Sequence, residues 1–268
     1  MPTIEENQQT WDGSYAWAQQ GDEWSLFWGS AEAQWVGSIL PRIHGLISTG
    51  TILEIAPGFG RWTDYLRKYC EQLVVVDLSE KCIKACQQRF AAEKNISYHV
   101  NDGKSLAMIP DNSIDFVFSF DSLVHAEADV METYLAQLAT KLKPNGVGFI
   151  HHSNLGAYQP AFAAIAQIPA EQRAGIVDQL LLEPTHWRAA SMTAKLFETY
   201  CDRANLQCIG QELVNWGNQG LLIDSFSMFT PKNSTWARDN QVIDNLAFMT
   251  EAASISKLSG LYSSTKRK

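Results

Sequence analysis

The sequence predicts an α/β fold in which a mostly parallel sheet is covered by helices on both faces. Short apolar, β-branched runs alternate with segments of helical spacing from Thr51 to His152. The first of these units also contains a glycine turn between its strand and its helix. Alternation of this kind implies right-handed crossovers, because each helix carries the chain back across one face so that the next strand runs the same way.

The first unit, Thr51 to Thr63, starts with an apolar run, continues through a Gly-x-Gly turn and ends in a helical pattern. Gly58 and Gly60 lack a Cβ atom, so the backbone can turn sharply and a ligand can approach it closely. The helix that follows presents N–H groups without intrahelical partners to polar ligand atoms. The unit therefore predicts a small-molecule site at the carboxyl end of the first strand.

A second buried strand, 73–77, ends in Asp77, which lies 17 residues after Gly60. A carboxylate at this place can accept hydrogen bonds from both hydroxyls of a ribose. Asp77 can also cap the helix that starts near Ser79, and the two roles are compatible.

The later units continue the alternation. We predict strands at 52–56, 73–77, 96–100, 114–120 and 146–152, and helices at 61–70, 80–92, 130–142 and 193–204. Because ligands bind parallel sheets at the carboxyl ends of the strands, we expect the polar residues that follow these strands to form the site.

Composition narrows the function classes. The chain has 268 residues, 46% of them hydrophobic, which is enough for a substantial core. A net charge of −8 and a pI near 5.2 argue against a nucleic-acid partner, because phosphate backbones require a basic surface. The five cysteines have no paired metal-binding spacing and are expected to be reduced. Without a membrane-length apolar run or a leader-like N-terminus, we expect a cytoplasmic protein with no membrane contact.

Three parts are expected: an aromatic-rich helical cover at 1–48, a ligand-binding domain at 49–232 and a helical extension at 233–268. Most aromatic rings of the cover should pack on the sheet, although rings such as Trp28 could instead cover a ligand. An insertion at 155–191 is placed to act as a substrate lid. The amphipathic spacing of 242–258 predicts a helix that packs on the domain or on a partner chain, which leaves a homodimer open.

Taken in order, the motifs resemble those of the S-adenosylmethionine-dependent methyltransferases of the Rossmann-like class (class I). The matching segments are Glu54 to Gly60, Asp77, Asn101-Asp102-Gly103, Asp115 to Phe120 and Leu142 to Gly146, within roughly residues 50–230. The resemblance implies a doubly wound, seven-stranded sheet with an antiparallel last strand, and segments 207–216 and 222–230 supply the final pair. Ala56 stands where the family usually has its first glycine. Alanine is the smallest replacement, so we expect the turn to form.

The resemblance also implies the cofactor, S-adenosyl-L-methionine, and the residues that bind it. By position these are Glu54, Ala56, Gly58, Gly60, Asp77, Leu78, Asp102, Gly103, Phe120 and Asp121. Glu54 would orient the ammonium group, Asp77 would hold the ribose, and Asp102 would accept from the adenine amino group. Asp102 could also simply stabilise an Asn-Asp-Gly turn. A nicotinamide oxidoreductase is the rival interpretation, but its fingerprint requires a glycine where this chain has Thr63.

Methyl transfer to a hydroxyl needs a base, and His125 follows the fourth strand where the resemblance places the methyl group. We therefore expect O-methylation of a sugar or secondary metabolite, with His125 as general base. Methylation of a nitrogen or a carboxylate, or a cofactor-binding module without catalysis, stays open. Substrate contacts are expected from His152, Trp28, His186, Trp187 and Arg188. Mg²⁺ is conceivable near the fourth and fifth strands but not favoured, because histidine suits Mg²⁺ poorly.

Overall fold

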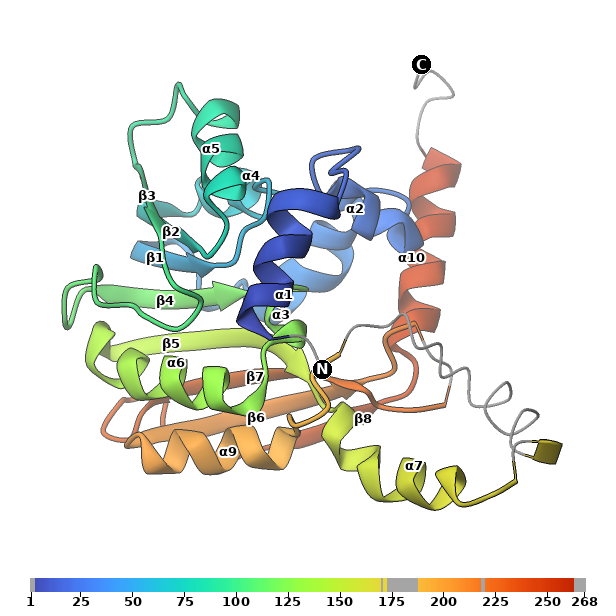
Figure 1. Cartoon of the computed structure of the whole chain (residues 1–268). Coiled ribbons are helices and arrows are strands. Elements are labelled where there is room, and N and C mark those ends of the chain that lie inside the picture. Colours follow the sequence, from blue (N-terminus) through green and yellow to red (C-terminus); the bar gives the residue numbers. More distant parts are fainter. Residues whose placement is uncertain (1–2, 170, 173–187, 218–219, 263–268) are drawn as a thin grey trace.

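The computed structural model describes residues 3–169, 171–172, 188–217 and 220–262 (Figure 1). In these residues the apolar runs form one eight-stranded sheet in the order β3-β2-β1-β4-β5-β7-β6-β8. The strands are β1 Thr49–Ile55, β2 Cys70–Asp77, β3 Ile96–Val100, β4 Ile114–Ser119, β5 Leu142–Ser153, β6 Leu206–Val214, β7 Asp224–Pro231 and β8 Val242–Asn245.

The sheet confirms the doubly wound topology. Neighbouring strands among β1 to β5 pair in parallel, whereas β7 pairs antiparallel with both β5 and β6. The predicted count of seven strands is wrong, because β8 adds a strand parallel to β6. Parallel neighbours such as β1, β2 and β4 place their carboxyl ends at one edge, which is where the predicted ligand-binding residues lie.

The eighth strand occupies the start of the segment for which we expected a continuous helix. Four residues pair with the outer edge of β6, and the Gln211 N–H donates to the Gln241 carbonyl just before them. The helix, α10 Phe248–Tyr262, begins only after this strand. A four-residue edge strand leaves no periodic pattern in the sequence, because its pairing partner lies about 30 residues away.

Helices cover both faces of the sheet, and alternate residues of each strand point to opposite faces. One face packs against α6 Ala128–Lys141 and α9 Ala194–Arg203. The other face packs against α4 Thr63–Leu66, α5 Glu80–Arg89 and α10 together with the N-terminal region, whose Trp28 and Trp35 are buried there. Figure 1 shows the N-terminal helices and α10 on the same side of the molecule.

The N-terminal region consists of three helical stretches. In the first, α1 Ile4–Gln9 continues directly into η1 Thr10–Ser14; η2 Asp22–Trp28 stands alone; and in the third, α2 Ala31–Gln34, η3 Trp35–Ile39 and α3 Leu40–Ile43 follow one another without a break. Polar caps start two of them: Thr3 and Glu6 form a capping box on α1, and the Ser30 hydroxyl accepts from the Ala33 N–H. Two residues with left-handed φ, Gly21 and Gly29, bound η2.

Two further differences from the predicted elements concern helix lengths. The helix expected at 61–70 shrinks to α4, because the N–H groups of Lys68 and Tyr69 donate to carbonyls three residues back and the chain enters β2 at Cys70. In the predicted insertion, η5 Leu155–Tyr158 and α7 Gln159–Ala166 follow β5, and Figure 1 shows α7 extending beyond the sheet. Each described helix is too short or too polar to span a bilayer.

Candidate functional site

A cavity of about 1540 Å³ lies at the carboxyl ends of β1, β2 and β4. From the sheet side it is lined by Ile55, Ala56, Gly58, Asp77, Leu78, Gly103, Phe120, Asp121 and His125, among others. From the N-terminal side it is lined by residues between Thr3 and Phe27. Small-molecule sites usually have volumes of about 300–1000 Å³, so this cavity has room for two ligands together.

The N-terminal side of the cavity is formed by residues 3–27, which we call the strap. The strap begins over the loop after β3: a Cβ atom placed on Gly103 would lie only 2.9 Å from Ile4 Cγ2, so α1 rests on the glycine. It then crosses the end of β2, where the Ser79 hydroxyl donates a short hydrogen bond to the Asp12 carboxylate.

The strap continues over the ends of β1 and β4. Trp17 stacks on Phe59 with a centroid distance of 4.4 Å and an interplanar angle of 6°. Further along, the Arg61 guanidinium donates to the Ser25 hydroxyl at 3.3 Å and forms an ion pair with Asp121 at 2.8 Å. The strap thus contacts residues that follow β1, β2, β3 and β4, and it lines one side of the cavity.

The predicted glycine turn after β1 forms despite the alanine. Ala56 has a φ of 58° and Gly58 a φ of 57°, so both adopt the left-handed conformation, which is strained for Ala56. A Cβ atom on Gly58 would lie 2.6 Å from the Trp17 ring, which means that the strap itself uses the space the glycine leaves. Gly60 does not line the cavity; a Cβ there would meet Phe90 and Cys86 instead, so its role in this structure is the packing of α5.

Asp77 lies at the end of β2 and lines the cavity, as predicted. Its carboxylate accepts from the Ser79 N–H at 2.8 Å and from the Gly58 N–H at 3.1 Å. Burial raises the pKa of Asp77 to about 7, although the backbone N–H donors oppose this shift. The carboxylate therefore links the turn after β1 to the end of β2, and with this pKa it changes its charge near neutral pH.

Glu54 lies in β1 and is buried beneath the cavity. Burial raises its pKa to about 8, and the Thr63 hydroxyl donates to Oε2 at 2.6 Å. Its Oε1 is also buried and has no hydrogen-bond partner among the described residues, and Glu54 itself does not line the cavity.

Asp102 departs from the expected role. It is exposed, and its Oδ1 accepts from the N–H groups of Lys104 at 2.9 Å and Ser105 at 2.6 Å, which lower its pKa. The Gly103 N–H is likewise engaged, donating to Asn101 Oδ1 at 3.0 Å. The structure therefore corrects the expectation for Asp102: it stabilises the turn, while only Gly103 of this pair lines the cavity.

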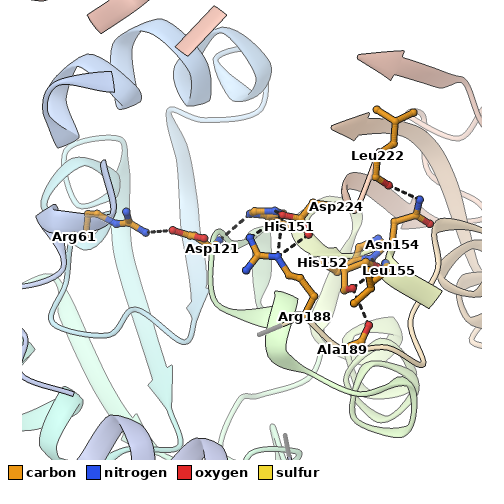
Figure 2. A network of polar contacts seen from close by, with 11 residues as sticks. Arg61, Asp121, His151, His152, Asn154, Leu155, Arg188, Ala189, Leu222 and Asp224 are labelled. Atoms are coloured by element: carbon orange, nitrogen blue, oxygen red, sulfur yellow. Dashed lines mark hydrogen bonds and ion pairs between the residues drawn. The ribbon is translucent and has the colours of Figure 1, made fainter. Parts of the chain in front are cut away.

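A chain of buried polar contacts reaches the cavity through two residues that line it, Asp121 and Arg188 (Figure 2). The Asp121 N–H donates to His151 Nδ1 at 3.1 Å, so this nitrogen carries no proton. Nε2 therefore carries the proton of the neutral ring and donates to Asp224 Oδ2 at 3.0 Å. Arg188 binds the same carboxylate through Nε at 2.8 Å and Nη2 at 2.9 Å. Both nitrogens of His151 are occupied, which makes it a residue that positions Asp121.

The predicted substrate residues divide into three groups. Arg188 lines the cavity. Trp28 is fully buried, its indole N–H donates to Ser38 Oγ at 2.7 Å, and it packs in the core, which corrects its assignment to the substrate. His186 and Trp187 lie outside the described residues.

His152 is corrected as well. It points to the opposite face of the sheet from His151, stacks on Phe197 at 4.4 Å and donates to or accepts from Ser227 Oγ at 2.8 Å. Burial lowers its pKa to about 4, so the ring is neutral and structural. The alternation of a strand predicts that only one histidine of the pair faces the site, but it does not tell which one.

His125 lines the cavity at the end of η4 Leu123–His125. Its ring lies 5.6 Å from the ring of Trp11 in the strap, and its carbonyl accepts from Asn7 Nδ2 at 3.3 Å. The predicted base is therefore brought together with Asp77 and Asp121 in one cavity. Sequence reasoning missed Asn7 and Arg61, which carry no motif and reach the site only through the fold.

Three residues of the lining carry buried polar atoms without a partner. Among the described residues, Asn7 Oδ1, Trp62 Nε1 and Glu127 Oε1 are buried without a hydrogen-bond partner, and all three residues line the cavity. Buried polar groups are normally satisfied, so these three atoms mark places where the cavity wall is not fully hydrogen-bonded. Within the same residues, no group of three or more His, Cys, Asp or Glu side chains is arranged to hold a metal ion.

Comparisons with known proteins agree with this architecture. Residues 52–146, from β1 into β5, match the family model of the methyltransferase domain. A phosphoethanolamine N-methyltransferase of Triticum aestivum is 25% identical over 224 residues, which cover 79% of this chain and 40% of that protein. The chain thus spans less than half of the curated relatives that it matches, 23% and 40% for two of them.

Solved structures share the fold. The PH0226 protein of Pyrococcus horikoshii OT3 has a TM-score of 0.54 at 20% identity, covering 75% of this chain and 91% of that one. The structure of a DhpI–SAH complex has a TM-score of 0.53 at 15% identity and covers 86% of this chain and 97% of that one. Residues 52–146 thus match a methyltransferase domain, and the doubly wound sheet that contains them has the fold of these solved structures.

Proposed function

We propose that the protein transfers a methyl group from S-adenosylmethionine to a small-molecule acceptor. The observation that carries this proposal is the cavity that joins the turn after β1, Asp77 after β2 and Asp121 after β4. Its volume of about 1540 Å³ leaves space for an acceptor beside the cofactor.

The chain's own residues would hold the two reactants in line. Asp77 would accept from the ribose hydroxyls, Leu78 would pack beside the adenine, and the backbone at Ala56 and Gly58 would lie along the amino-acid part. Phe120 and Asp121 would line the methionine side. The cofactor supplies an electrophilic methyl group on a sulfonium centre, and the protein contributes position and exclusion of water.

For a hydroxyl acceptor, His125 is the proposed general base. Its place on the cavity wall supports this role, and a neutral imidazole suits proton removal near physiological pH. We expect His125→Ala to lower turnover of a hydroxyl acceptor by about 10²-fold or more while the affinity for S-adenosylhomocysteine stays unchanged. Steady-state kinetics together with calorimetry would measure both, and near-normal turnover would remove His125 from the mechanism.

An amine acceptor is the second candidate. It is supported by the printed name of the wheat relatives and by the rings that line the cavity: Trp11, Tyr15, Trp17, Trp24, Phe27, Trp62, Phe120 and Trp216. Aromatic faces attract cationic ligands, and an amine that has lost its proton needs no strong base. Under this chemistry, His125→Ala would reduce turnover far less than for a hydroxyl acceptor.

The cofactor assignment is tested by thermal-shift titration with S-adenosylhomocysteine and, in parallel, with NAD. A ligand that binds only the folded state raises the melting temperature with concentration. We expect stabilisation by the homocysteine compound alone, lost in Asp77→Ala. Stabilisation by NAD would favour an oxidoreductase, and stabilisation by neither ligand would contradict the proposal. Binding without turnover across acceptor classes would favour a non-catalytic module.

A further inference from the structure

Arg61 brings a buried positive charge to the cavity. It follows the glycine turn after β1, is 7% exposed and lines the cavity. Its Nη2 forms an ion pair with Asp121 at 2.8 Å, and its Nη1 donates to the Ser25 hydroxyl at 3.3 Å. The guanidinium also lies over the Trp62 ring, 4.5 Å from the ring centroid. These contacts hold the side chain in one orientation.

The Nε atom of Arg61 has no hydrogen-bond partner among the described residues. Enclosed polar atoms without a partner occur elsewhere in these residues, but this nitrogen is not among them, so it keeps contact with open space. The open space that Arg61 borders is the cavity. A guanidinium presents its N–H groups in a rigid plane that suits a carboxylate. The cavity wall therefore contains a fixed charged donor that the described side chains do not use.

Asp121, the counter-charge of Arg61, has a strained backbone. Its φ is 64°, a left-handed conformation that costs energy for a residue with a Cβ atom. The ion pair with Arg61 and the hydrogen bond from its N–H to His151 hold it there. Its Oδ1 has no partner among the described residues and is not an enclosed atom either. Strain of this kind is kept where the surrounding structure enforces it, often at a functional site.

The ion pair lies next to the turn after β1. The Ser122 hydroxyl donates to the Ala56 carbonyl at 2.7 Å, which ties the residue after Asp121 to this turn. Under the proposed function, the amino-acid part of the cofactor lies along the backbone of the same turn. That part carries one carboxylate and one ammonium group, so its two charges complement those of Arg61 and Asp121. Glu54, the residue expected to orient the ammonium group, does not line the cavity.

Among the described residues, two other Lys or Arg side chains line the cavity, and their contacts lie elsewhere. Lys104 follows β3 and pairs with Asp129 in α6. Arg188 binds Asp224 at the start of β7 through two of its nitrogens. Of the three cations, Arg61 is the one that connects the turn after β1 to the end of β4.

We infer that Arg61 binds the carboxylate of the cofactor's amino-acid end through Nε, with Asp121 holding the guanidinium in place. This inference rests on the proposed function. It also links the cofactor to the strap, because the same guanidinium donates to Ser25 in η2.

The test compares S-adenosylhomocysteine with its decarboxylated analogue, in which a hydrogen atom replaces the carboxylate. The analogue leaves the Arg61 Nε–H without its acceptor. We expect the wild type to bind S-adenosylhomocysteine at least about tenfold more tightly than the analogue in isothermal titration calorimetry. In Arg61→Gln, which lacks the guanidinium, this preference should fall by about tenfold.

Two further variants separate recognition from folding and from net charge. Arg61→Lys keeps a positive charge for Asp121 but has no Nε, so the preference should still fall; this variant decides the question if Arg61→Gln does not fold. Lys104→Gln removes another cation of the lining, with the same change in net charge, and should keep the preference of the wild type. Because the preference is a ratio within one variant, a loosened strap that weakens both compounds equally leaves it unchanged.

The outcomes distinguish the inference from the function on which it rests. Loss of the preference in the Arg61 variants but not in Lys104→Gln supports the inference. A full preference in Arg61→Gln or Arg61→Lys, an equal loss in Lys104→Gln, or no preference in the wild type overturns the inference, while binding of S-adenosylhomocysteine by the wild type leaves the proposed function standing. If the wild type binds neither compound, the proposed function fails, and the inference fails with it.

Discussion

At the scale of single residues, the charge of the Asp77 carboxyl group should govern cofactor binding. Burial raises its pKa to about 7, and ribose hydroxyls donate best to the ionised carboxylate. Below this pKa the group must lose a proton before the ligand binds. We therefore expect the affinity for S-adenosylhomocysteine to fall about tenfold for each pH unit below 7 and to level off above it, as measured by calorimetry.

Asp77→Asn is the matched control for this pH profile. The amide has the same shape, but it cannot ionise, so binding should be weaker and the contribution of Asp77 to the pH dependence should vanish. Any dependence that remains would belong to other groups such as Glu54, whose pKa burial raises to about 8. Identical profiles for the wild type and Asp77→Asn would contradict the prediction.

Single residues differ in how far the sequence reveals them. Asp77 and Gly58 could be predicted because a strand end and a tight turn fix their positions locally. The buried polar contacts next to the cavity could not be predicted, because Arg61 and Asp121 are 60 residues apart and His151 and Asp224 are 73 residues apart. Asp102 was misplaced for a local reason: its turn satisfies the carboxylate with its own backbone.

Among the elements, the strap should control how fast the cofactor leaves. Trp17 holds it over the turn after β1 by stacking on Phe59, and within the strap its indole N–H donates to the Trp11 carbonyl at 3.2 Å. An aromatic pair contributes about 0.5–1.5 kcal/mol beyond its buried area. Trp17→Ala should accordingly speed the dissociation of S-adenosylhomocysteine by between about twofold and tenfold in stopped-flow fluorescence.

Val36→Ala provides the comparison for Trp17→Ala. Val36 is an exposed apolar residue in η3 that does not line the cavity, so its removal should leave the dissociation rate unchanged. Equal rates in the wild type and Trp17→Ala would show that the strap does not restrain the ligand.

The observed strands agree with the predicted ones where a buried apolar run specifies the strand. The strands β1 to β4 begin and end within a few residues of their predicted bounds, because each run is long and bounded by turn residues. The edge strand β8 could not be predicted, since four residues acquire strand geometry only by pairing with β6. The strap was expected to be a cover, but its path along the strand ends depends on tertiary contacts such as that of Ile4 with Gly103.

For the whole molecule, one buried carboxylate joins the antiparallel end of the sheet to the cavity. Asp224 opens β7, His151 lies in β5, and Arg188 precedes α9; Asp224 and His151 are fully buried (Figure 2). Through the His151 ring this cluster also holds the backbone of Asp121 at the end of β4. The same contacts therefore support the fold and the shape of the site.

Replacing this carboxylate should destabilise the entire fold. Asp224→Asn leaves the Arg188 charge buried without its counter-charge, and breaking a buried ion pair in this way costs about 3–5 kcal/mol of unfolding free energy, measurable by urea denaturation at pH 7.

Burial alone would raise the pKa of Asp224, but Arg188 and His151 outweigh it and lower the pKa to about 2. The unfolded chain has a pKa near 4, so the contribution is complete above pH ~4 and is lost as the pH falls toward ~2. The gap between the wild type and Asp224→Asn should narrow over this interval. Asp202→Asn, which removes an exposed partner of Lys232, should change stability little. Equal stability of Asp224→Asn and the wild type at pH 7 would mean that the cluster does not hold the sheet together.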